Sequence, residues 1–454
     1  MATSKDSFIQ LHIGVDSVDS PFGGCTTHFV FRVTKELIRK FRVRFLDYPN
    51  LIRLNPAIPF KTRGNGAVSL HLLVRRDDLQ RIIDYLTNEV IKYLIEFSGD
   101  YRKVGLAYLI GNDVPYEVRE LFLKALTDYV HTDYLLSVIN ALGDKLLFPL
   151  GISRGTVGAL ASLASTYEVV SDCTYELLVY REPPYTKERV VDTDLLWRID
   201  RLFSKYLFTT FDRGSRKLLA TPHGPDPVLL GIRSDDDSVL ATIADLLTKY
   251  LSGINGCLIF RTNQGTDQHL VSRDLSEFKL YQTGCISGVV SAKPTSLAGG
   301  DVLTEVTSEG RALKVVAFRE TELSKVLTKL VIGDEITVCG TMKYWEGIGN
   351  VLHIEKIIIR KLIREKEVNP LCPRCGHRMK SAGRNKGFKC PKCGYKARLS
   401  KVKVRINRDI EEGTYVPPNK SIKHLNKPRV RYVRTSKCVI KEPQKFLWIP
   451  QNSH

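Results

Sequence analysis

Residues 11–41 read LHIGVDSVDSPFGGCTTHFVFRVTKELIRKF, which predicts a strand, an acidic turn and an amphipathic helix in direct succession. Apolar residues alternate over 11–15 as in a half-buried strand, and Asp16 falls where that strand ends. The turn continues through Asp19 to the pair Gly23–Gly24, and glycine lets backbone N–H groups approach a ligand. The segment therefore predicts a strand-turn-helix unit that gathers polar groups on its turn.

One interpretation of this turn is phosphate chemistry. A helix start favours an anion, and Asp16 and Asp19 carry oxygen ligands of the kind that hold the Mg²⁺ accompanying a nucleotide. Thr26 or Thr27 is expected to cap the helix. The alternative is structural: the aspartates and serines form side-chain turns, and the threonines only cap.

A second polar loop, residues 53–66, reads RLNPAIPFKTRGNG and precedes another predicted strand. Its polar and glycine residues are Lys61, Thr62, Arg63, Gly64 and Asn65. Charged groups and backbone N–H groups on such a loop can clamp a triphosphate. The loop does not follow the Walker A pattern, so a solvated surface loop is the alternative interpretation.

The 454 residues suffice for about two to four domains. No apolar run approaches the length of a membrane span and the N-terminus lacks the apolar stretch of a signal peptide, so we expect a cytoplasmic protein that does not enter membranes. Residues 355–454 hold 27 Lys and Arg against 7 Asp and Glu, whereas the rest of the chain is nearly neutral. A basic last quarter predicts a region that binds a polyanion, with a solvated tail as the alternative.

Two Cys-Pro-X-Cys-Gly knuckles form the strongest spacing signal of the chain. They place Cys372, Cys375, Cys390 and Cys393 in two pairs separated by fourteen residues. Four thiolates suit a closed, structural Zn²⁺ site, with redox cysteines or an iron–sulfur site as the alternative. The six other cysteines are scattered, and we expect no disulfides in a cytoplasmic protein.

Two further parts of the chain show recognisable element orders. Residues 279–362 predict five short strands with a helical piece between the third and fourth, the order of an OB barrel, with an SH3-like or other β domain as the alternative. Residues 200–262 alternate helices and strands in a manner typical of a ferredoxin-like unit. Glu176 and Asp226 lie on a strand and a polar loop, and either carboxylate could bind a cationic small molecule or simply form turns.

Taken together, the chain resembles the archaeal family of tRNA(isoleucine) 2-agmatinylcytidine synthetases, or agmatidine synthases (the TiaS family), nearly from end to end. The motifs that carry the resemblance are Gly14-Val-Asp-Ser-Val-Asp-Ser with Gly24-Cys-Thr-Thr27, Ile52-Arg-Leu-Asn-Pro with Lys61-Thr-Arg-Gly-Asn-Gly66, Tyr175-Glu-Leu, Pro222-His-Gly-Pro-Asp-Pro-Val228 and Phe260-Arg-Thr-Asn-Gln264. The order of barrel and zinc motif also agrees with the family.

The resemblance implies a multidomain α+β protein in which a kinase-like α/β domain and a ferredoxin-like domain precede an OB-fold β-barrel and a zinc ribbon. We expect the kinase-like, ATP-using domain over 1–135, the ferredoxin-like domain over 136–275, the OB domain over 279–362, the ribbon over 368–400 and a basic C-terminal tail over 401–454. The sequence does not fix the boundary between the first two domains, which can interleave.

The implied activity is that of an ATP-dependent carbon–nitrogen ligase. The family activates the ring 2-carbonyl of the wobble cytidine of the AUA-reading isoleucine tRNA, whose anticodon is CAU, by phosphorylation, and then replaces the oxygen with agmatine. ATP, Mg²⁺ and Zn²⁺ are the implied cofactors, and no obligate protein partner is evident. A non-catalytic RNA- or single-strand DNA-binding protein built on the OB barrel and ribbon is the alternative; a nucleic-acid ligase is disfavoured because no Lys-x-Asp-Gly motif is present.

The resemblance also assigns candidate roles to residues. The catalytic candidates are Asp16, Asp19 and Thr26, where Thr26 occupies the position that is phosphorylated in the family. The ATP and Mg²⁺ candidates are Asp16, Ser17, Asp19, Gly23, Gly24, Lys61, Thr62, Arg63, Gly64 and Asn65. The substrate-binding candidates are Arg154, Glu176, Asp226 and Asn263. Where the family usually has paired aspartates, this chain has Asp16-Ser17, so one metal-binding charge is replaced by a hydroxyl.

Overall fold

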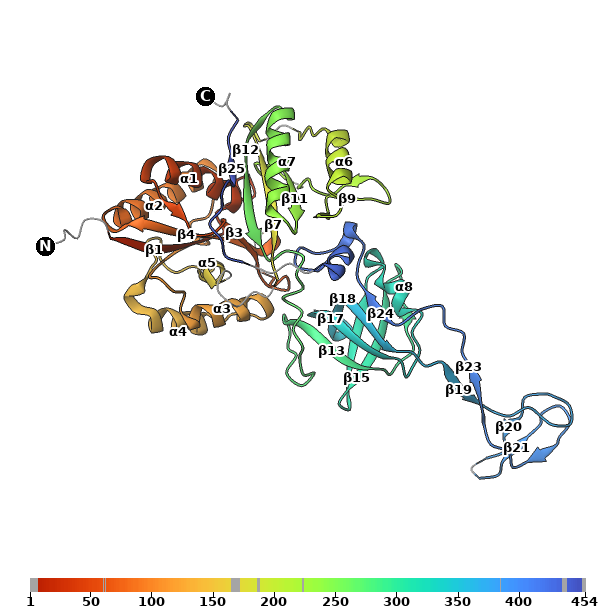
Figure 1. The fold of residues 1–454 in the computed structure, drawn as a ribbon. Helices are drawn as coiled ribbons and strands as arrows, with labels where there is room; N and C mark the ends of the chain where they lie inside the picture. The colour runs from red at the N-terminus through yellow and green to blue at the C-terminus, as the bar shows by residue number, and fades with distance from the viewer. Residues whose placement is uncertain are drawn as a thin grey trace. The chain divides into compact units, whose positions relative to one another are not determined.

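The computed structural model describes residues 7–59, 61, 63–164, 172–185, 188–222, 224–383, 385–434 and 439–450, with the side chain of Arg63 left out. The chain divides into two units, shown in Figure 1. The first comprises Met1–Cys285, Gly340–Asn350 and Val416–His454, and the second comprises Ile286–Cys339 and Val351–Tyr415.

An eleven-stranded sheet forms the centre of the first unit. Its order is β6-β5-β1-β4-β3-β12-β7-β11-β8, with β2 beside β4 and β25 beside β12. The strands are β1 (Phe8–Asp16), β2 (Arg44–Phe45), β3 (Asn50–Arg53), β4 (Gly66–Arg75), β5 (Gly105–Ile110), β6 (Leu146–Leu147), β7 (Thr174–Arg181), β8 (Leu207–Phe208), β11 (Val228–Ser234), β12 (Ile254–Thr262) and β25 (Leu447–Trp448). The parallel pair β3–β12 joins an N-terminal half to a second half of the sheet.

Helices cover both faces of the N-terminal half (Figure 1). They are α1 (Thr26–Phe41) and α2 (Leu79–Glu96) on one face, and α3 (Tyr116–Thr127), α4 (Thr132–Leu142) and α5 (Thr156–Leu163) on the other. The sequence predicted a half-buried strand at 11–15, and this was wrong: β1 is buried at every position from Leu11 to Asp16. The reason is that His12 and Gly14 face a second helical layer, which the alternation of residues does not reveal.

The second half of the sheet confirms the ferredoxin-like unit. Its elements follow the order β7, α6 (Thr193–Leu202), β8, β11, α7 (Asp237–Tyr250) and β12, with a small hairpin of β9 (Phe211–Asp212) and β10 (Lys217–Leu218) inserted after β8. The strands lie in the order β12-β7-β11-β8, the arrangement that a split βαβ fold requires.

The predicted OB barrel is also present. Its strands are β13 (Thr283–Val290), β14 (Thr295–Ser296), β15 (Val302–Ser308), β16 (Arg311–Ala317), β17 (Glu335–Trp345), β18 (Gly349–Lys361) and β24 (Gly413–Tyr415). They follow the order β13-β17-β18-β16-β15-β14, and pairing of β13 with β15 closes the sheet. Helix α8 (Leu323–Leu327) lies between β16 and β17, as the sequence predicted.

The zinc-motif segment forms a small ribbon between the two strands of an antiparallel pair. That pair consists of β19 (Glu365–Val368) and β23 (Val402–Arg405), and the ribbon itself holds β20 (Lys380–Ser381), β21 (Phe388–Lys389) and β22 (Lys396–Ala397). Its only buried cluster consists, among the described residues, of Cys372, Met379, Phe388 and Cys390. So small a core is typical of segments that gain folding free energy from a bound metal.

Much of the C-terminal segment, which the sequence suggested as a basic tail, packs onto the first unit. Strand β25 pairs with β12, and the side chain of Arg431 is fully buried. Arg431 Nη2 lies 2.8 Å from Asp172 Oδ1 and its Nε bonds Asp235, while Lys427 Nζ lies 2.9 Å from Asp172 Oδ2. Part of the positive charge of this segment is therefore neutralised within the protein.

Two other sequence expectations were wrong. The N-cap of α1 is Cys25, not a threonine, because the turn ends one residue earlier, at Gly24. In addition, Cys173, Cys285 and Cys339 are disulfide-bonded, since the fold brings together cysteines whose spacing in the sequence carries no pattern.

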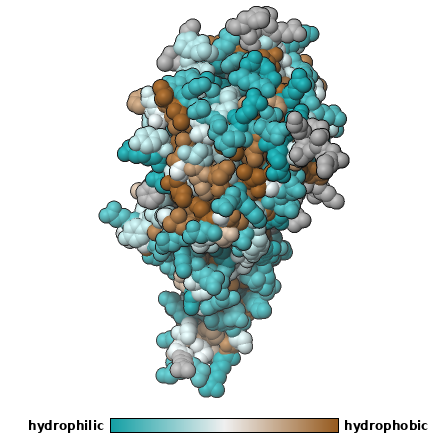
Figure 2. Space-filling model, turned by 90° about the vertical axis from the view of Figure 1, so that its left-hand side faces the viewer, coloured by the Kyte–Doolittle hydropathy of each residue, from teal (hydrophilic) through white to brown (hydrophobic). Residues whose placement is uncertain are grey.

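The outer surface is mainly hydrophilic on the face drawn in Figure 2, where apolar side chains gather in one central region. Large apolar side chains that are exposed include Phe22, Ile95 and Tyr101. No helix of the described chain has the length and apolar character needed to cross a membrane.

The close approach of β1 and α5 yields a stability prediction. A Cβ at Gly14 would lie 2.0 Å from the carbonyl oxygen of Ala159, so Gly14→Ala forces the helix away from the sheet. We expect Gly14→Ala to lower the free energy of unfolding by about 1–3 kcal/mol. Denaturant unfolding measures this change.

Gly214→Ala is the matched control, because the nearest atom to a Cβ there, Asp212 Oδ1, is 3.9 Å away. It should leave the stability unchanged or slightly raised. Equal stability of the two variants would contradict the proposed packing limit between β1 and α5.

Candidate functional site

The acidic turn after β1 separates its two aspartates. Asp16 is the last residue of β1, and Ser17 then adopts a left-handed conformation with φ of 61°. This change of chain direction places Asp16 and Asp19 on the walls of different cavities. The chain then bends through Ser20 and Gly23 into α1.

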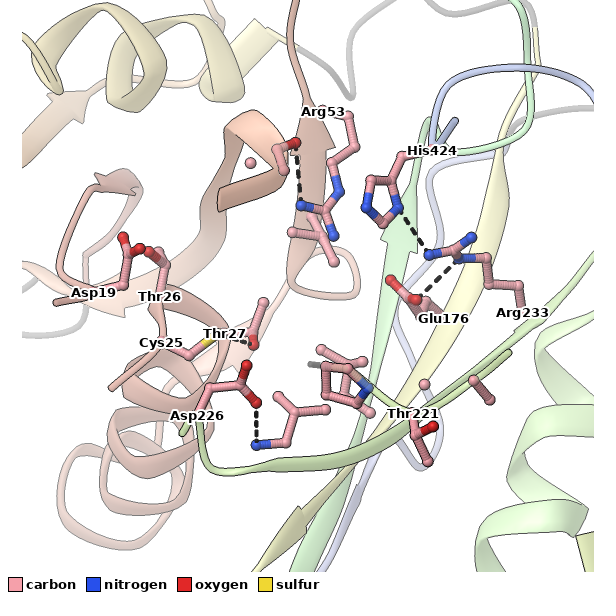
Figure 3. Close-up of a pocket in the computed structure, with 18 of the residues that line it drawn as sticks. Asp19, Cys25, Thr26, Thr27, Arg53, Glu176, Thr221, Asp226, Arg233 and His424 are labelled. Carbon is pink, nitrogen blue, oxygen red and sulfur yellow. Dashed lines mark hydrogen bonds and ion pairs between the residues drawn. The ribbon is translucent and has the colours of Figure 1, made fainter. Parts of the chain in front are cut away.

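The first cavity, called here the carboxylate cavity, has a volume of about 440 Å³ (Figure 3). Its polar side chains come from Asp19, Cys25, Thr26, Thr27, Arg53, Glu176, Thr209, Thr221, Asp226, Arg233 and His424. Figure 3 shows Asp19, Thr26 and Asp226 along one side, and Arg53, His424 and Arg233 along the other. The cavity thus has an acidic and a basic side.

The carboxylates of this cavity differ in their partners. Glu176 Oε1 accepts a bond of 3.0 Å from Arg233 Nε, and Glu176 Oε2 accepts another from Gln264. Asp226 Oδ1 accepts from Arg189 Nη2 at 3.0 Å and from the backbone N–H of Val228 at 3.2 Å. Glu176 and Asp226 are thus each paired with an arginine, but Asp226 and Asp19 lie on the side of the cavity opposite Arg53 and Arg233, which makes them the better candidates for a cationic ligand.

The start of α1 contributes hydroxyl and thiol groups to the same cavity. Thr26 is the first residue of the helix and is drawn beside Asp19 in Figure 3. Cys25 Sγ lies 3.1 Å from Thr27 Oγ1, and burial raises the pKa of the Cys25 thiol. Cys25 is therefore a protonated thiol at neutral pH, so it is a poor nucleophile.

The second cavity, called here the lysine cavity, has a volume of about 400 Å³. Its polar residues are Asp16, Ser17, Lys61, Asn65, Lys103, Asp128, Tyr129, Thr132, Ser153 and Arg154. Burial, with a smaller effect of Asp19, raises the pKa of Asp16 to about 7. Such a carboxylate gains from a cation beside it, because the cation stabilises its charged form.

Helix α5 begins at this lysine cavity. Gly155, Val157 and Gly158 line it, and a Cβ at Gly158 would come within 1.9 Å of Asp16 Oδ2. The first N–H groups of a helix have no intrahelical acceptor and favour an anion. Three cationic side chains and a helix start make this cavity suited to a polyphosphate.

The structure thus distributes the sequence candidates over several places. Asp16, Ser17, Lys61, Asn65 and Arg154 line the lysine cavity, and Asp19, Gly24, Thr26, Gly64, Glu176 and Asp226 line the carboxylate cavity. Gly23 is buried in the turn, and Asn263 is buried with its side chain bonded to the backbone N–H and C=O of Arg53. Thr62 and the side chain of Arg63 lie outside the described residues.

Sequence reasoning passed over Lys103, Arg53, Arg233 and His424, which the fold adds to the two cavities. The glycine-marked turn 151–158 before an apolar helix was a usable signal for the anion-binding start of α5. His424 had no local signal, because it enters the cavity from a segment 160 positions beyond its neighbour Gln264.

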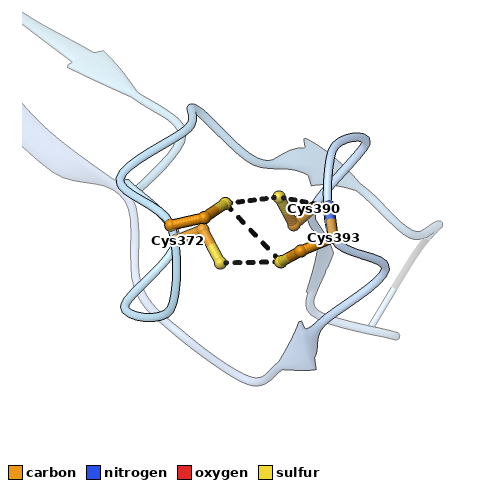
Figure 4. A group of neighbouring side chains, drawn as sticks. Cys372, Cys390 and Cys393 are labelled. Atoms are coloured by element: carbon orange, nitrogen blue, oxygen red, sulfur yellow. Dashed lines mark hydrogen bonds between the residues drawn. The ribbon is translucent and has the colours of Figure 1, made fainter.

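The four cysteines of the knuckles converge in the ribbon (Figure 4). Their sulfurs all lie within 4.8 Å of one another, with Cys375–Cys390 at 3.4 Å and Cys372–Cys393 at 3.5 Å. Zn–S bonds of about 2.3 Å in a tetrahedron separate sulfurs by about 3.8 Å, so the arrangement fits Zn²⁺. Among the described residues, this is the one group of metal-ligating side chains with three or more members.

Comparison with known proteins gives three family-model matches. They are the TiaS TCKD domain over residues 12–98, the TiaS FLD domain over 153–269 and the TiaS C-terminal zinc ribbon domain over 369–410. The isoleucine-tRNA 2-agmatinylcytidine synthetase TiaS of Thermofilum pendens is 40% identical, covering 92% of this chain and 94% of its own. That of Pyrococcus horikoshii is 37% identical, covering 92% and 97%.

Solved structures agree with these relatives. A crystal structure of TiaS in complex with its isoleucine tRNA and ATP superposes with a TM-score of 0.76 at 30% identity, covering 95% of this chain and 100% of the other. A complex of TiaS with the same tRNA, AMPCPP and agmatine gives 0.74 at 27% identity, with the same coverage.

Zinc content provides a test of the ribbon. Because the ribbon has a small apolar core, Cys390→Ser should abolish stoichiometric zinc and expose the ribbon to proteolysis, as should a strong chelator. Metal analysis together with limited proteolysis measures both effects. Cys25→Ser, outside the ribbon, is the control and should keep its zinc; loss of zinc there as well would contradict the assignment.

Proposed function

The chain belongs to the TiaS family of isoleucine-tRNA 2-agmatinylcytidine synthetases, and we propose that it joins agmatine to the wobble cytidine of the AUA-reading isoleucine tRNA at the expense of ATP. The observation that supports this most strongly is the match over more than nine-tenths of the chain to relatives of this name. Two polar cavities of opposite character beside one acidic turn fit the two small substrates.

ATP binds in the lysine cavity. The triphosphate carries several negative charges, and Lys61, Lys103 and Arg154 bring three cations to this cavity. The N-terminal end of α5 lines the cavity through Val157 and Gly158, and the positive end of the helix dipole favours an anion. The sequence placed Arg154 among the substrate-binding candidates. In our proposal Arg154 binds the triphosphate.

Mg²⁺ fits the lysine cavity as well. Asp16 and Ser17 supply oxygen donors, which Mg²⁺ prefers, and the buried Asp16 carboxylate needs a positive neighbour to stay charged. The ion would neutralise charge on the triphosphate when bound. Because Ser17 offers a hydroxyl in place of a carboxylate, Asp16 provides the main negative charge for the ion. Asp19 lies close enough to raise the pKa of Asp16.

Agmatine binds in the carboxylate cavity. The molecule is a dication with an amine at one end and a guanidinium at the other, so carboxylates are its natural partners. Asp226 and Asp19 are proposed to hold it, since they lie on the side of the cavity opposite Arg53 and Arg233, whereas Glu176 lies beside Arg233. Asn263 serves indirectly, by fixing the backbone of Arg53 at the cavity wall.

The turn between the cavities is where phosphoryl transfer takes place in this proposal. Asp16 faces the triphosphate, whereas Thr26 and Asp19 face the second cavity. Thr26 Oγ is the candidate phosphoryl acceptor, at the N-terminal end of α1. Activation is required because the ring oxygen is a poor leaving group until it is phosphorylated.

The OB barrel and the ribbon provide the nucleic-acid-binding part of the enzyme. OB barrels commonly bind single-stranded nucleic acid, and the ribbon carries Arg374 over the ring of Tyr395 at 5.2 Å. The wobble base must leave its stack to reach a cavity, as bases do in other enzymes that modify them. The cytoplasmic location expected from the sequence is part of this proposal.

The decisive experiment is incubation of the full chain with ATP, agmatine and the isoleucine tRNA that carries the CAU anticodon, followed by mass spectrometry of the anticodon nucleoside. We expect a mass gain equal to agmatine minus water, dependent on both ATP and agmatine. An unchanged nucleoside, under conditions where a relative from Pyrococcus horikoshii is active, would refute the proposal.

The separation of the substrates predicts different kinetic defects. Arg154→Met should raise the KM for ATP about tenfold and leave the KM for agmatine unchanged, because one charge-assisted contact is lost. Asp226→Asn should do the reverse. Steady-state kinetics with each substrate varied in turn checks both, and Arg81→Met on the exposed face of α2 is the control. Equal effects of both variants on both substrates would contradict two separate sites.

A further inference from the structure

The basic side of the carboxylate cavity holds a guanidinium without a carboxylate partner. Arg53 Nη1 donates only a long bond, 3.3 Å, to the carbonyl of Gly64. Its Nε is buried and has no hydrogen-bond partner, and among the residues that the structure describes no carboxylate lies within ion-pair distance of Arg53. Burial lowers the pKa of Arg53, so the protein bears a cost for keeping this charge here.

Two further nitrogen groups lie beside Arg53. Arg233 is paired through Nε with Glu176, while its Nη2 lies 2.9 Å from His424 Nδ1. The same Nδ1 lies 2.9 Å from Gln264 Oε1, which can only accept. When Nδ1 accepts from the guanidinium, which can only donate, the imidazole proton resides on Nε2. Arg53 and Arg233 keep the pKa of His424 well below its usual range, which leaves the imidazole neutral with one N–H to offer.

The chain brings these three side chains together from distant positions. Arg53 ends β3, Arg233 lies near the end of β11, and His424 belongs to the C-terminal segment. That segment is fixed by backbone bonds of 2.8 Å from Gly265 N–H to His424 C=O and from Asp267 N–H to Leu425 C=O. The buried Arg431 anchors it a few residues later.

The net charge of this group is positive. Arg53 and Arg233 contribute two cations, Glu176 contributes one anion, and His424 is neutral. An oxyanion placed between Arg53 and His424 would receive N–H bonds from both and balance the remaining charge.

From this juxtaposition we propose that Arg53, Arg233 and His424 form a phosphate-binding subsite that receives the phosphate leaving the activated base. The proposal rests on the proposed function. It also gives the C-terminal segment a role, because that segment would contribute the His424 side chain to the active site.

The chemical step balances as follows. The ammonium group of agmatine, held on the acidic side, first loses one proton to solvent, and the resulting neutral amine attacks ring carbon 2 and forms the C–N bond. The bond between carbon 2 and the phosphorylated oxygen breaks, and its electron pair stays on that oxygen. A second proton passes from the nitrogen to the leaving group, which departs as hydrogen phosphate, and Arg53 and His424 stabilise its developing charge.

The test is direct binding of inorganic phosphate to the full chain, measured by calorimetry with a non-hydrolysable ATP analogue occupying the lysine cavity. We expect saturable binding that Arg53→Met weakens about tenfold or more, since a charge-assisted contact is lost. Arg53→Lys should recover part of the affinity, and His424→Gln should weaken it less than Arg53→Met does. Arg81→Met is the matched control and should bind phosphate like the wild type.

A negative result for the phosphate subsite can be distinguished from a negative result for the proposed function, because phosphate binding is measured without turnover. Absence of saturable binding, or binding that Arg53→Met leaves unchanged while the variant keeps its thermal stability, would overturn the subsite. A tRNA phosphodiester is the other source of such an oxyanion. In that case Arg53→Met would weaken tRNA binding and reduce its salt slope by about one, with phosphate binding unaffected, which also overturns the proposal.

Discussion

The pairing of β3 with β12 is the contact on which the active-site geometry depends. Only two residue pairs form this parallel ladder, Asn50 with Arg261 and Leu51 with Thr262. A buried ion pair, Arg261 Nε to Asp47 Oδ2 at 2.7 Å, and the amide of Asn263 on the Arg53 backbone reinforce it. The two halves also share one hydrophobic core, in which Phe31 stacks on Tyr180 with ring centroids 4.5 Å apart, and both halves line the carboxylate cavity.

In our proposal the two cavities of the site correspond to two substrates of opposite charge. A polyphosphate and a dicationic amine placed in one open pocket would neutralise each other instead of reacting. The turn through Ser17 directs Asp16 toward the cationic cavity and Asp19 toward the acidic one. One turn of the chain therefore contributes a carboxylate to each cavity, and in our proposal the phosphoryl group is transferred across this turn.

The C-terminal segment shows that part of a charge excess can be used inside the protein. Its excess of Lys and Arg is typical of a region that binds nucleic acid, yet Arg431 and Lys427 form ion pairs with Asp172 inside the protein. Burying a cation is costly, so each buried arginine here needs a carboxylate from the body. These contacts hold His424 in position, which links the part of the chain that follows the ribbon to the active site.

The sequence by itself determined the element order, the ferredoxin-like unit, the OB barrel and the four zinc ligands, because periodicity, turn residues and Cys spacing are local properties. It also predicted that Asp16, Asp19 and the loop of Lys61 bind a ligand, which stays a prediction. Only the tertiary structure decided that β1 is covered on both faces, that Asp16 and Asp19 serve different cavities, and that Arg53, Arg233 and His424 meet. Those facts depend on contacts between residues far apart in the chain, which a single sequence does not encode in any local pattern.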